Sequence, residues 1–96
     1  MNETIAQVLI LKSLCPMAFR NERERSFDLK WHLYPINPRE LAKNGLYFDG
    51  VPERPDQVKC VYCHSHFYDW KSNDDPRKEH RRLAPLCPVF GNFNTY

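Results

Sequence analysis

The stretch VKCVYCHSHFYDWKSNDDPRKEHRRLAPLC, from Val58 to Cys87, decides the fold because it places three cysteines and three histidines within thirty residues. Cys60 and Cys63 form a C-x2-C pair, the spacing with which one short segment binds a single tetrahedral ion through two thiolates. His80 and Cys87 complete a C-x2-C-x16-H-x6-C pattern. Sulfur and imidazole ligands favour Zn²⁺. Four protein ligands leave no open coordination position, so the pattern predicts one structural zinc ion and no hydrolytic centre.

Two other histidines compete for the fourth ligand position. His64 directly follows Cys63, so its use would cramp the chelate ring, and His66 is expected to alternate onto the opposite face of its strand. His80 is therefore the favoured ligand, with His64 and His66 as alternatives. Cys15 is left over and is expected to be a free thiol.

Length and charge restrict the function classes. A chain of 96 residues forms one small domain with a thin core, for which a metal staple is a common source of stability. The 14 basic and 12 acidic residues give a net charge of +2, and the clusters RNERER and RKEHRR are interrupted by acids or histidine. Such mixed faces are typical of solvated helices and argue against a nucleic-acid partner.

The apolar run near the N-terminus predicts neither export nor membrane insertion. It opens with Glu3, lacks a small-residue cleavage site, and falls short of the ~20 apolar residues needed to cross a bilayer. We therefore expect a cytoplasmic protein, in the host cell cytoplasm if the source is viral, whose cysteines are metal ligands and not disulfides. Residues 1–18 are expected to form an apolar, helical arm, packed on the domain at 19–96 or on a second copy through residues 1–14.

Local signals predict short helices and three strands. A charged helix is expected over 19–27, with Arg23 pointing inward and needing partners. Asn37 and Pro38 begin a helix of one to two turns, and Gly45 ends it. The segments LYFDG (46–50), VKCVYC (58–63) and HFYDW (66–70) predict an antiparallel sheet with a turn at His64-Ser65. A last helix begins at Asp75 and Pro76 and ends before Pro85.

These segments together resemble a known family. The matching pieces are R-E-R-S-F ending at Phe27, Trp31, P-R-E-L-A-K-N-G-L-Y-F-D-G from Pro38, V-K-C-V-Y-C, W-K-S-N-D-D-P-R-K-E-H and Cys87. From Arg23 to Cys87 the chain closely resembles the baculoviral IAP repeat, or BIR, domain of inhibitor of apoptosis (IAP) proteins. The resemblance implies an α+β fold of short helices around a three-stranded antiparallel sheet, one zinc held by Cys60, Cys63, His80 and Cys87, and buried hydrogen bonds for Arg23.

The resemblance also implies a binding function without catalysis. Many BIR domains bind a freshly exposed N-terminus, typically beginning with Ala, as an extra strand beside the third strand. Here the backbones of Phe67 and Asp69 would pair with the peptide, Asp74 with help from Glu79 would bind its ammonium group, and Trp70 would wall the first side-chain pocket. The alternatives are a charge at a helix N-terminus for Asp74 and a plain core residue for Trp70.

The chain departs from groove-binding BIR domains at two groove positions and in two lengths: Phe27 to Trp31 is one residue longer than usual, and the loop VPERPDQ (51–57) is extended. Leu83 stands where these domains usually carry a second Trp, and His66 where they often have Gly. Three classes of function stay open: an anti-apoptotic module that binds caspases or IAP antagonists, a groove-less BIR domain for self-association or adaptor binding, and a zinc nucleic-acid binder that the charge disfavours. The chain has no RING-type cysteine and histidine array, so no ubiquitin-ligase activity is expected of it.

Overall fold

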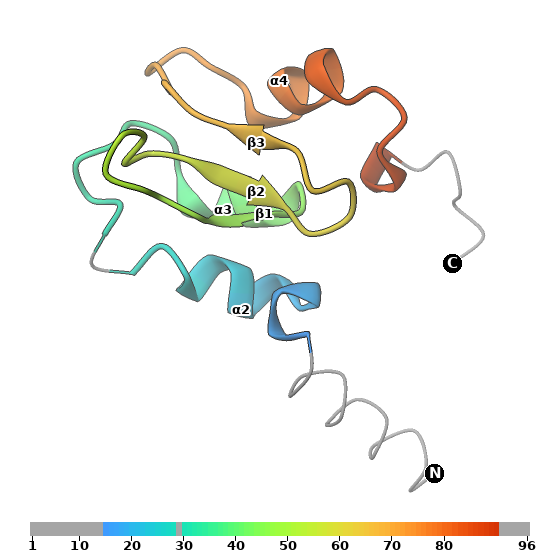
Figure 1. Cartoon of the computed structure of the whole chain (residues 1–96), viewed down its shortest axis with the longest axis horizontal. Coiled ribbons are helices and arrows are strands. Elements are labelled where there is room, and N and C mark those ends of the chain that lie inside the picture. Colours follow the sequence, from blue (N-terminus) through green and yellow to red (C-terminus); the bar gives the residue numbers. More distant parts are fainter. Residues whose placement is uncertain (1–14, 29, 91–96) are drawn as a thin grey trace, which may run out of the picture.

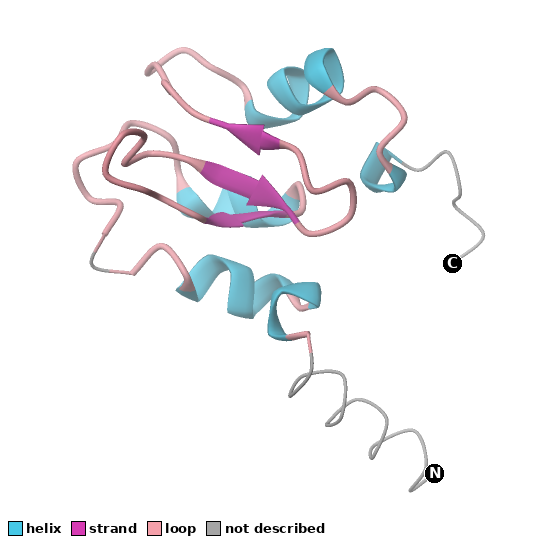
Figure 2. Cartoon of the chain, in the orientation of Figure 1, coloured by secondary structure: helices cyan, strands magenta, loops and turns pink. Residues whose placement is uncertain are grey.

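The computed structural model describes residues 15–28 and 30–90. Three antiparallel strands, β1 (Leu46–Phe48), β2 (Val58–Cys60) and β3 (His66–Phe67), form one sheet in the order β1-β2-β3. Helices α2 (Arg20–Arg25) and α3 (Pro38–Lys43) lie toward β1, and α4 (Pro76–Leu83) lies beyond β3 (Figure 1). Two 3₁₀ turns, η1 (Pro16–Ala18) and η2 (Pro88–Phe90), precede α2 and follow α4. The predicted α+β class, with short helices around a three-stranded sheet, is confirmed (Figure 2).

Local capping chemistry sets the bounds of α3 and α4. Asn37 accepts a hydrogen bond from the Arg39 N–H, and Asp75 accepts from the N–H groups of Arg77 and Lys78. These bonds satisfy amides that a helix N-terminus otherwise leaves without partners. Gly45 follows α3 with a φ of 82°, the left-handed conformation predicted for it.

All three strands are shorter than the sequence predicts, and β1 ends at Phe48 where the prediction extends to Gly50. The chain leaves β2 after Cys60 in a turn closed by the His64 N–H on the Cys60 carbonyl, with His64 at a φ of 64°. The predicted strand over 66–70 ends at Phe67, and Asp69 has a φ of 60°. A left-handed residue ends a strand because it turns the next peptide out of the ladder. The turn after β3 positions the residues of the groove described below.

The core lies between the sheet and the helices. Leu41, Leu46, Val58 and Cys60 are fully buried. Phe27 and Trp31 meet edge to face with ring centroids 5.0 Å apart, and the Trp31 Nε1–H donates to the Ile36 carbonyl. This packing buries the inner face of the sheet and holds β1 and β2 against the helices.

Arg23 points inward from α2, as predicted. Its side chain is 4% exposed, and its Nε donates to the Ala42 carbonyl at 2.9 Å. Its Nη1 donates to the carbonyls of Met17 and Ala18. One buried cation therefore joins η1, α2 and α3, with each contact directed at a backbone carbonyl.

The predictions for the N-terminal arm fall mainly outside the described residues. The structure describes residues 15–18 of the segment 1–18, and there η1 packs against α2. The rest of the predicted helical arm and the dimerisation surface predicted for residues 1–14 lie outside the described residues. Among the helices in the described part of the chain, none has the length and apolar character of a membrane span.

Candidate metal centre and groove

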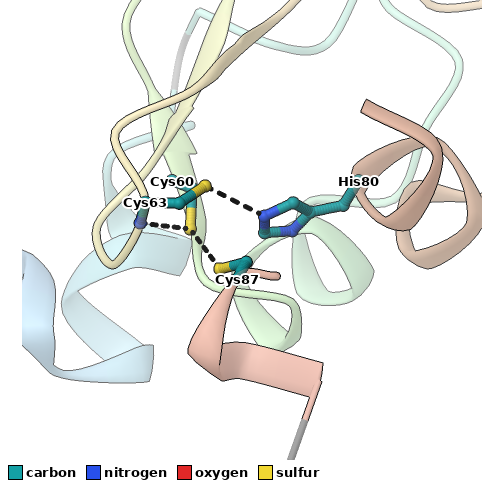
Figure 3. A group of neighbouring side chains, drawn as sticks. All are labelled: Cys60, Cys63, His80 and Cys87. Carbon is teal, nitrogen blue, oxygen red and sulfur yellow. Dashed lines mark hydrogen bonds between the residues drawn. The ribbon is translucent and has the colours of Figure 1, made fainter. Parts of the chain in front are cut away.

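Four side chains from separate elements converge at one end of the sheet. Figure 3 shows Cys60 and Cys63, from β2 and the turn after it, facing His80 of α4 and Cys87 from the loop before η2. Cys60, His80 and Cys87 are buried, and Cys63 is half-buried. The tight turn after β2 is what brings the first two thiols onto one side, since it reverses the chain within four residues of Cys60.

The spacing of the four ligand atoms fits one ion. The Sγ atoms of Cys60 and Cys87 are 3.6 Å apart, and the Cys63 Sγ lies 3.5 Å from the His80 Nε2. All four atoms lie within 4.8 Å of one another. Metal–sulfur bonds of about 2.3 Å and metal–nitrogen bonds of about 2.0 Å produce tetrahedral edges close to these distances. The cluster could therefore hold a metal ion.

Burial and hydrogen bonds shift the pKa values of these four side chains. It raises the pKa of the Cys60 thiol to about 12 and also raises the pKa of Cys87. Burial acts in the same direction on Cys63, but hydrogen bonds led by those of Ser65 outweigh it and lower the pKa of that thiol. Burial lowers the pKa of His80, which favours the neutral imidazole that binds metals. A bound cation would offset the cost of burying thiolates at this site.

The competing histidines lie elsewhere. His64 occupies the left-handed position of the turn and is exposed. His66 is exposed on β3, and its Nε2 lies 3.3 Å from an Asp49 carboxylate oxygen. Neither belongs to the cluster of potential ligands found among residues 15–28 and 30–90.

A groove of about 450 Å³ lies between β3 and α4. Its walls include every residue that the sequence predicts for peptide binding: Phe67, Asp69, Trp70, Asp74, Glu79 and Leu83. They also include residues that the sequence did not single out for this role, namely Tyr68, Lys71 and Arg82, together with His66. Acidic, basic and aromatic side chains thus meet in one concave surface.

Asp56 holds the turn that forms one wall of this groove. Its carboxylate is buried and accepts hydrogen bonds from the N–H groups of Asp69, at 3.1 Å, and Trp70, at 2.8 Å. Two bonds from consecutive amides fix the backbone where Asp69 adopts its left-handed φ. Trp70 is thereby held at 8% exposure with its ring lining the groove. The role of Asp56 is not visible in the sequence alone, because its partners lie 13 and 14 positions along the chain.

Two carboxylates lie in the groove at the start of α4. Asp74 accepts a hydrogen bond from the Lys71 N–H at 2.8 Å, which orients its side chain. The Glu79 carboxylate accepts from Arg82 Nη2, also at 2.8 Å. The pKa of Arg82 is raised, first by this hydrogen bond and then by the Glu79 charge. Asp74 and Glu79 can attract a cation, and Arg82 partly neutralises Glu79.

The hydrogen bonds of β2 alternate between its two neighbours. The Val61 N–H donates to the Gly45 carbonyl on the β1 side, whereas the Cys60 N–H donates to the Ser65 carbonyl on the β3 side. In an antiparallel sheet this alternation continues along the strand. Even-numbered residues of β2 therefore bond toward β3.

The register then identifies the backbone groups at the outer edge of β3. Val58 aligns with Phe67, and Lys59 aligns with His66. Since Val58 bonds toward β3, the backbone groups of Phe67 face β2, and those of His66 face away from it. Tyr68 follows by alternation. This register favours His66 and Tyr68 over Phe67 and Asp69 as partners for an added strand, and the described sheet has no further strand at that edge.

The chain is similar in sequence to proteins that inhibit apoptosis. A family profile described as "BIR: Inhibitor of Apoptosis domain" matches residues 23–91. "Apoptosis inhibitor IAP" of Cydia pomonella granulosis virus is 39% identical over 59 residues, covering 62% of this chain and 20% of that protein. "Baculoviral IAP repeat-containing protein 3" of Homo sapiens is 32% identical over 91 residues, covering 82% of this chain and 15% of that protein. The chain thus spans about a fifth or less of the length of these two relatives.

Solved structures share the fold. The crystal structure of "DIAP1 BIR1 bound to a Grim peptide" aligns with a TM-score of 0.61 and 35% identity, covering 73% of this chain and 68% of that one. The "autoinhibited dIAP1-BIR1 domain" aligns with a TM-score of 0.65 and 33% identity, covering 76% and 71%. The first of these neighbours is a domain with a peptide bound to it.

Proposed function

Because the chain belongs to the BIR family of IAP domains, we propose that it binds partners with a free, Ala-type N-terminus by adding them as a strand to β3. A BIR domain is a protein-interaction module and not a catalytic one. The partners would be IAP antagonists or caspases, in the cytoplasm, and binding them would oppose apoptosis. The peptide-bound state of a neighbour at 35% identity supports the antagonist class.

One observation carries this proposal: the free edge of β3 and two carboxylates lie in the same groove. The outward backbone groups of His66 and Tyr68 are suited to pair with an extended peptide. Asp74 and Glu79 both line this groove, and the first nitrogen of that peptide would lie beside them. A free ammonium group beside these carboxylates would form charge-assisted hydrogen bonds, which an acetylated terminus cannot form.

Trp70 and Leu83 would contact the first side chain of the peptide. Trp70 is nearly buried and has a fixed backbone, whereas Leu83 is 52% exposed. Leu83 offers less apolar wall than an aromatic ring would. If a Trp at this position buried about 50 Å² more apolar surface, binding would strengthen by ~1 kcal/mol, or about fivefold.

We also infer that the metal of the cluster is one structural zinc ion. Three sulfur ligands and one imidazole suit Zn²⁺ better than cations that prefer oxygen. The ion would be held by Cys60, Cys63, His80 and Cys87. Its role would be to crosslink β2, α4 and the loop before η2. The groove lies between α4 and β3, the strand that pairs with β2, so the zinc would help to set the width of the groove.

A titration of Trp70 fluorescence tests the peptide proposal. We expect an Ala-starting peptide to bind and its acetylated twin to bind about 10- to 100-fold more weakly, as expected for the loss of a charge-assisted contact worth about 1.5–3 kcal/mol. Asp74→Asn keeps an acceptor for the Lys71 N–H but removes the charge, and it should weaken only the free peptide. Leu83→Trp should tighten binding.

Asp28→Asn is the matched control, because Asp28 is an exposed acid that does not line the groove. It should leave both affinities unchanged. Equal binding of the free and acetylated peptides, or no binding of either at millimolar concentration, would contradict the proposal. The second result would instead favour the groove-less class of BIR domain.

A further inference from the structure

We propose that Arg54 makes the groove selective for an acidic side chain at the second residue of the bound peptide. This inference rests on the proposed function and adds a determinant of specificity to it. Arg54 belongs to the loop before β2, outside the residues that line the groove.

The backbone register decides which peptide residue lies beside Tyr68. The first residue of the peptide directs its nitrogen to Asp74 and Glu79. The second residue is therefore the first whose N–H and carbonyl can both bond to the outward backbone groups of Tyr68. The fourth residue then lies opposite His66, because outward-facing positions recur every two residues.

Side chains of directly opposed residues lie on the same face of a sheet. Phe67 points into the core, so the side chains of His66 and Tyr68 point to the solvent face by alternation. The second peptide side chain would lie on that face beside Tyr68, which is 41% exposed. The first and third side chains would point the other way, toward Trp70 and Leu83.

Arg54 covers the ring of Tyr68. Its guanidinium carbon lies 4.1 Å from the ring centroid, a close cation–π stack. Stacking uses the face of the guanidinium and leaves its N–H groups free to bind a carboxylate from the edge. An acidic side chain on the second peptide residue would meet these donors.

The backbone of Arg54 is fixed before any ligand binds. Its N–H donates to the Val51 carbonyl at 2.9 Å, and its carbonyl accepts from the N–H groups of Val51 and Gln57 at 3.1 Å. The loop is thus closed on itself and bonded to Gln57, the residue before β2. A donor held in place in this way loses little conformational freedom on binding.

The charges around Arg54 leave it available. Within the described residues it forms no ion pair with a carboxylate, whereas the Asp49 carboxylate contacts His66 and Gln57. Two lysines add positive charge around the groove. Lys71 lines it, and Lys59 lies opposite His66 on the same face of the sheet. Acids that could oppose the effect are Glu53, the preceding residue, and Asp69, which follows Tyr68.

The test uses three peptides that differ only at the second residue: Ala-Glu-Ala-Phe, Ala-Gln-Ala-Phe and Ala-Lys-Ala-Phe, each with a free N-terminus and an amidated C-terminus. At low ionic strength we expect the Glu peptide to bind the full chain about threefold or more tightly than the Lys peptide, as is typical of an exposed ion pair. Arg54→Gln should bring the affinities together, and Arg54→Glu should reverse their order. Arg25→Gln, which removes an exposed cation from α2, should keep the preference.

The outcomes separate the two proposals. Equal affinities for the Glu and Lys peptides in the unaltered chain, or a preference that survives Arg54→Gln, would overturn the role of Arg54 while leaving the peptide groove in place. Failure of all three peptides to bind would overturn the proposed function and this inference with it.

Discussion

At the scale of single residues, Asp56 connects the sheet to the groove. Its buried carboxylate bonds two consecutive amides, those of Asp69 and Trp70. Asp56→Asn would place an NH₂ group against one of these N–H donors and leave it unsatisfied. We expect a loss of about 1–3 kcal/mol in the free energy of unfolding.

The same substitution should also shift the fluorescence emission of Trp70 to longer wavelength and broaden it, because the ring becomes more mobile and more exposed to water. Chemical denaturation of the zinc-loaded chain measures the first effect, and steady-state fluorescence the second. Glu53→Gln is the control, since Glu53 is exposed in the same loop. An unfolding midpoint for Asp56→Asn equal to that of the unaltered chain would show that the two hydrogen bonds to Asp56 contribute nothing to stability.

Arg82 is a second single residue that we expect to affect peptide binding, because it should weaken the binding of the peptide ammonium group. It bonds Glu79 at 2.8 Å and adds a positive charge beside the position proposed for the peptide ammonium. Arg82→Gln should therefore tighten binding of a free Ala-type N-terminus by about two- to fivefold. Arg81→Gln is a close match as a control, because Arg81 is on the same helix but lies over the Phe90 ring. Weaker binding by Arg82→Gln would mean that Arg82 contacts the peptide favourably.

At the scale of elements, Arg23 is the main polar connection between α2 and its neighbours. Arg23→Gln would leave the buried Ala42 carbonyl without its donor and separate η1 from α2. We expect a loss of about 2–4 kcal/mol in unfolding free energy. Arg25→Gln removes an exposed cation whose partner Glu22 is 3.6 Å away, and it should cost less than about 0.5 kcal/mol. Urea unfolding compares the two variants, and equal midpoints would contradict the role assigned to Arg23.

Elements with local causes could be predicted from the sequence. Asn37, Gly45 and Asp75 act on residues two or three positions away, so their roles in bounding α3 and α4 are visible in the sequence alone. The four-residue cluster was also predictable, because ligand chemistry restricts both residue type and spacing.

Features with distant causes could not be predicted in this way. The early end of β3 depends on Asp56, which precedes β2. The stack of Arg54 on Tyr68 likewise depends on how a proline-rich loop folds back. The sequence predicts Phe67 and Asp69 as the backbone partners because it does not contain the register of β2 and β3, which favours His66 and Tyr68.

At the scale of the whole molecule, the proposed zinc ion should control folding. Apparent binding free energies of structural zinc sites are about 10–16 kcal/mol, which exceeds the net stability expected of so small a domain. Elemental analysis should find about one zinc per chain, and chelation should abolish the near-UV spectrum. Cys60→Ser and His80→Ala should lose metal and fold, whereas His64→Ala and His66→Ala should keep both. Full zinc content in His80→Ala would contradict the ligand assignment.

The central claim is that a peptide with a free N-terminus adds a strand to the outer edge of β3. Residue-resolved amide hydrogen exchange, with and without an Ala-starting peptide, tests it most directly, because the register assigns each amide a direction. We predict that the His66 and Tyr68 amides become protected on binding, while the Phe67 amide, which already faces β2, changes little. Protection that rises on α2 or elsewhere, with His66 and Tyr68 unchanged, would contradict the account.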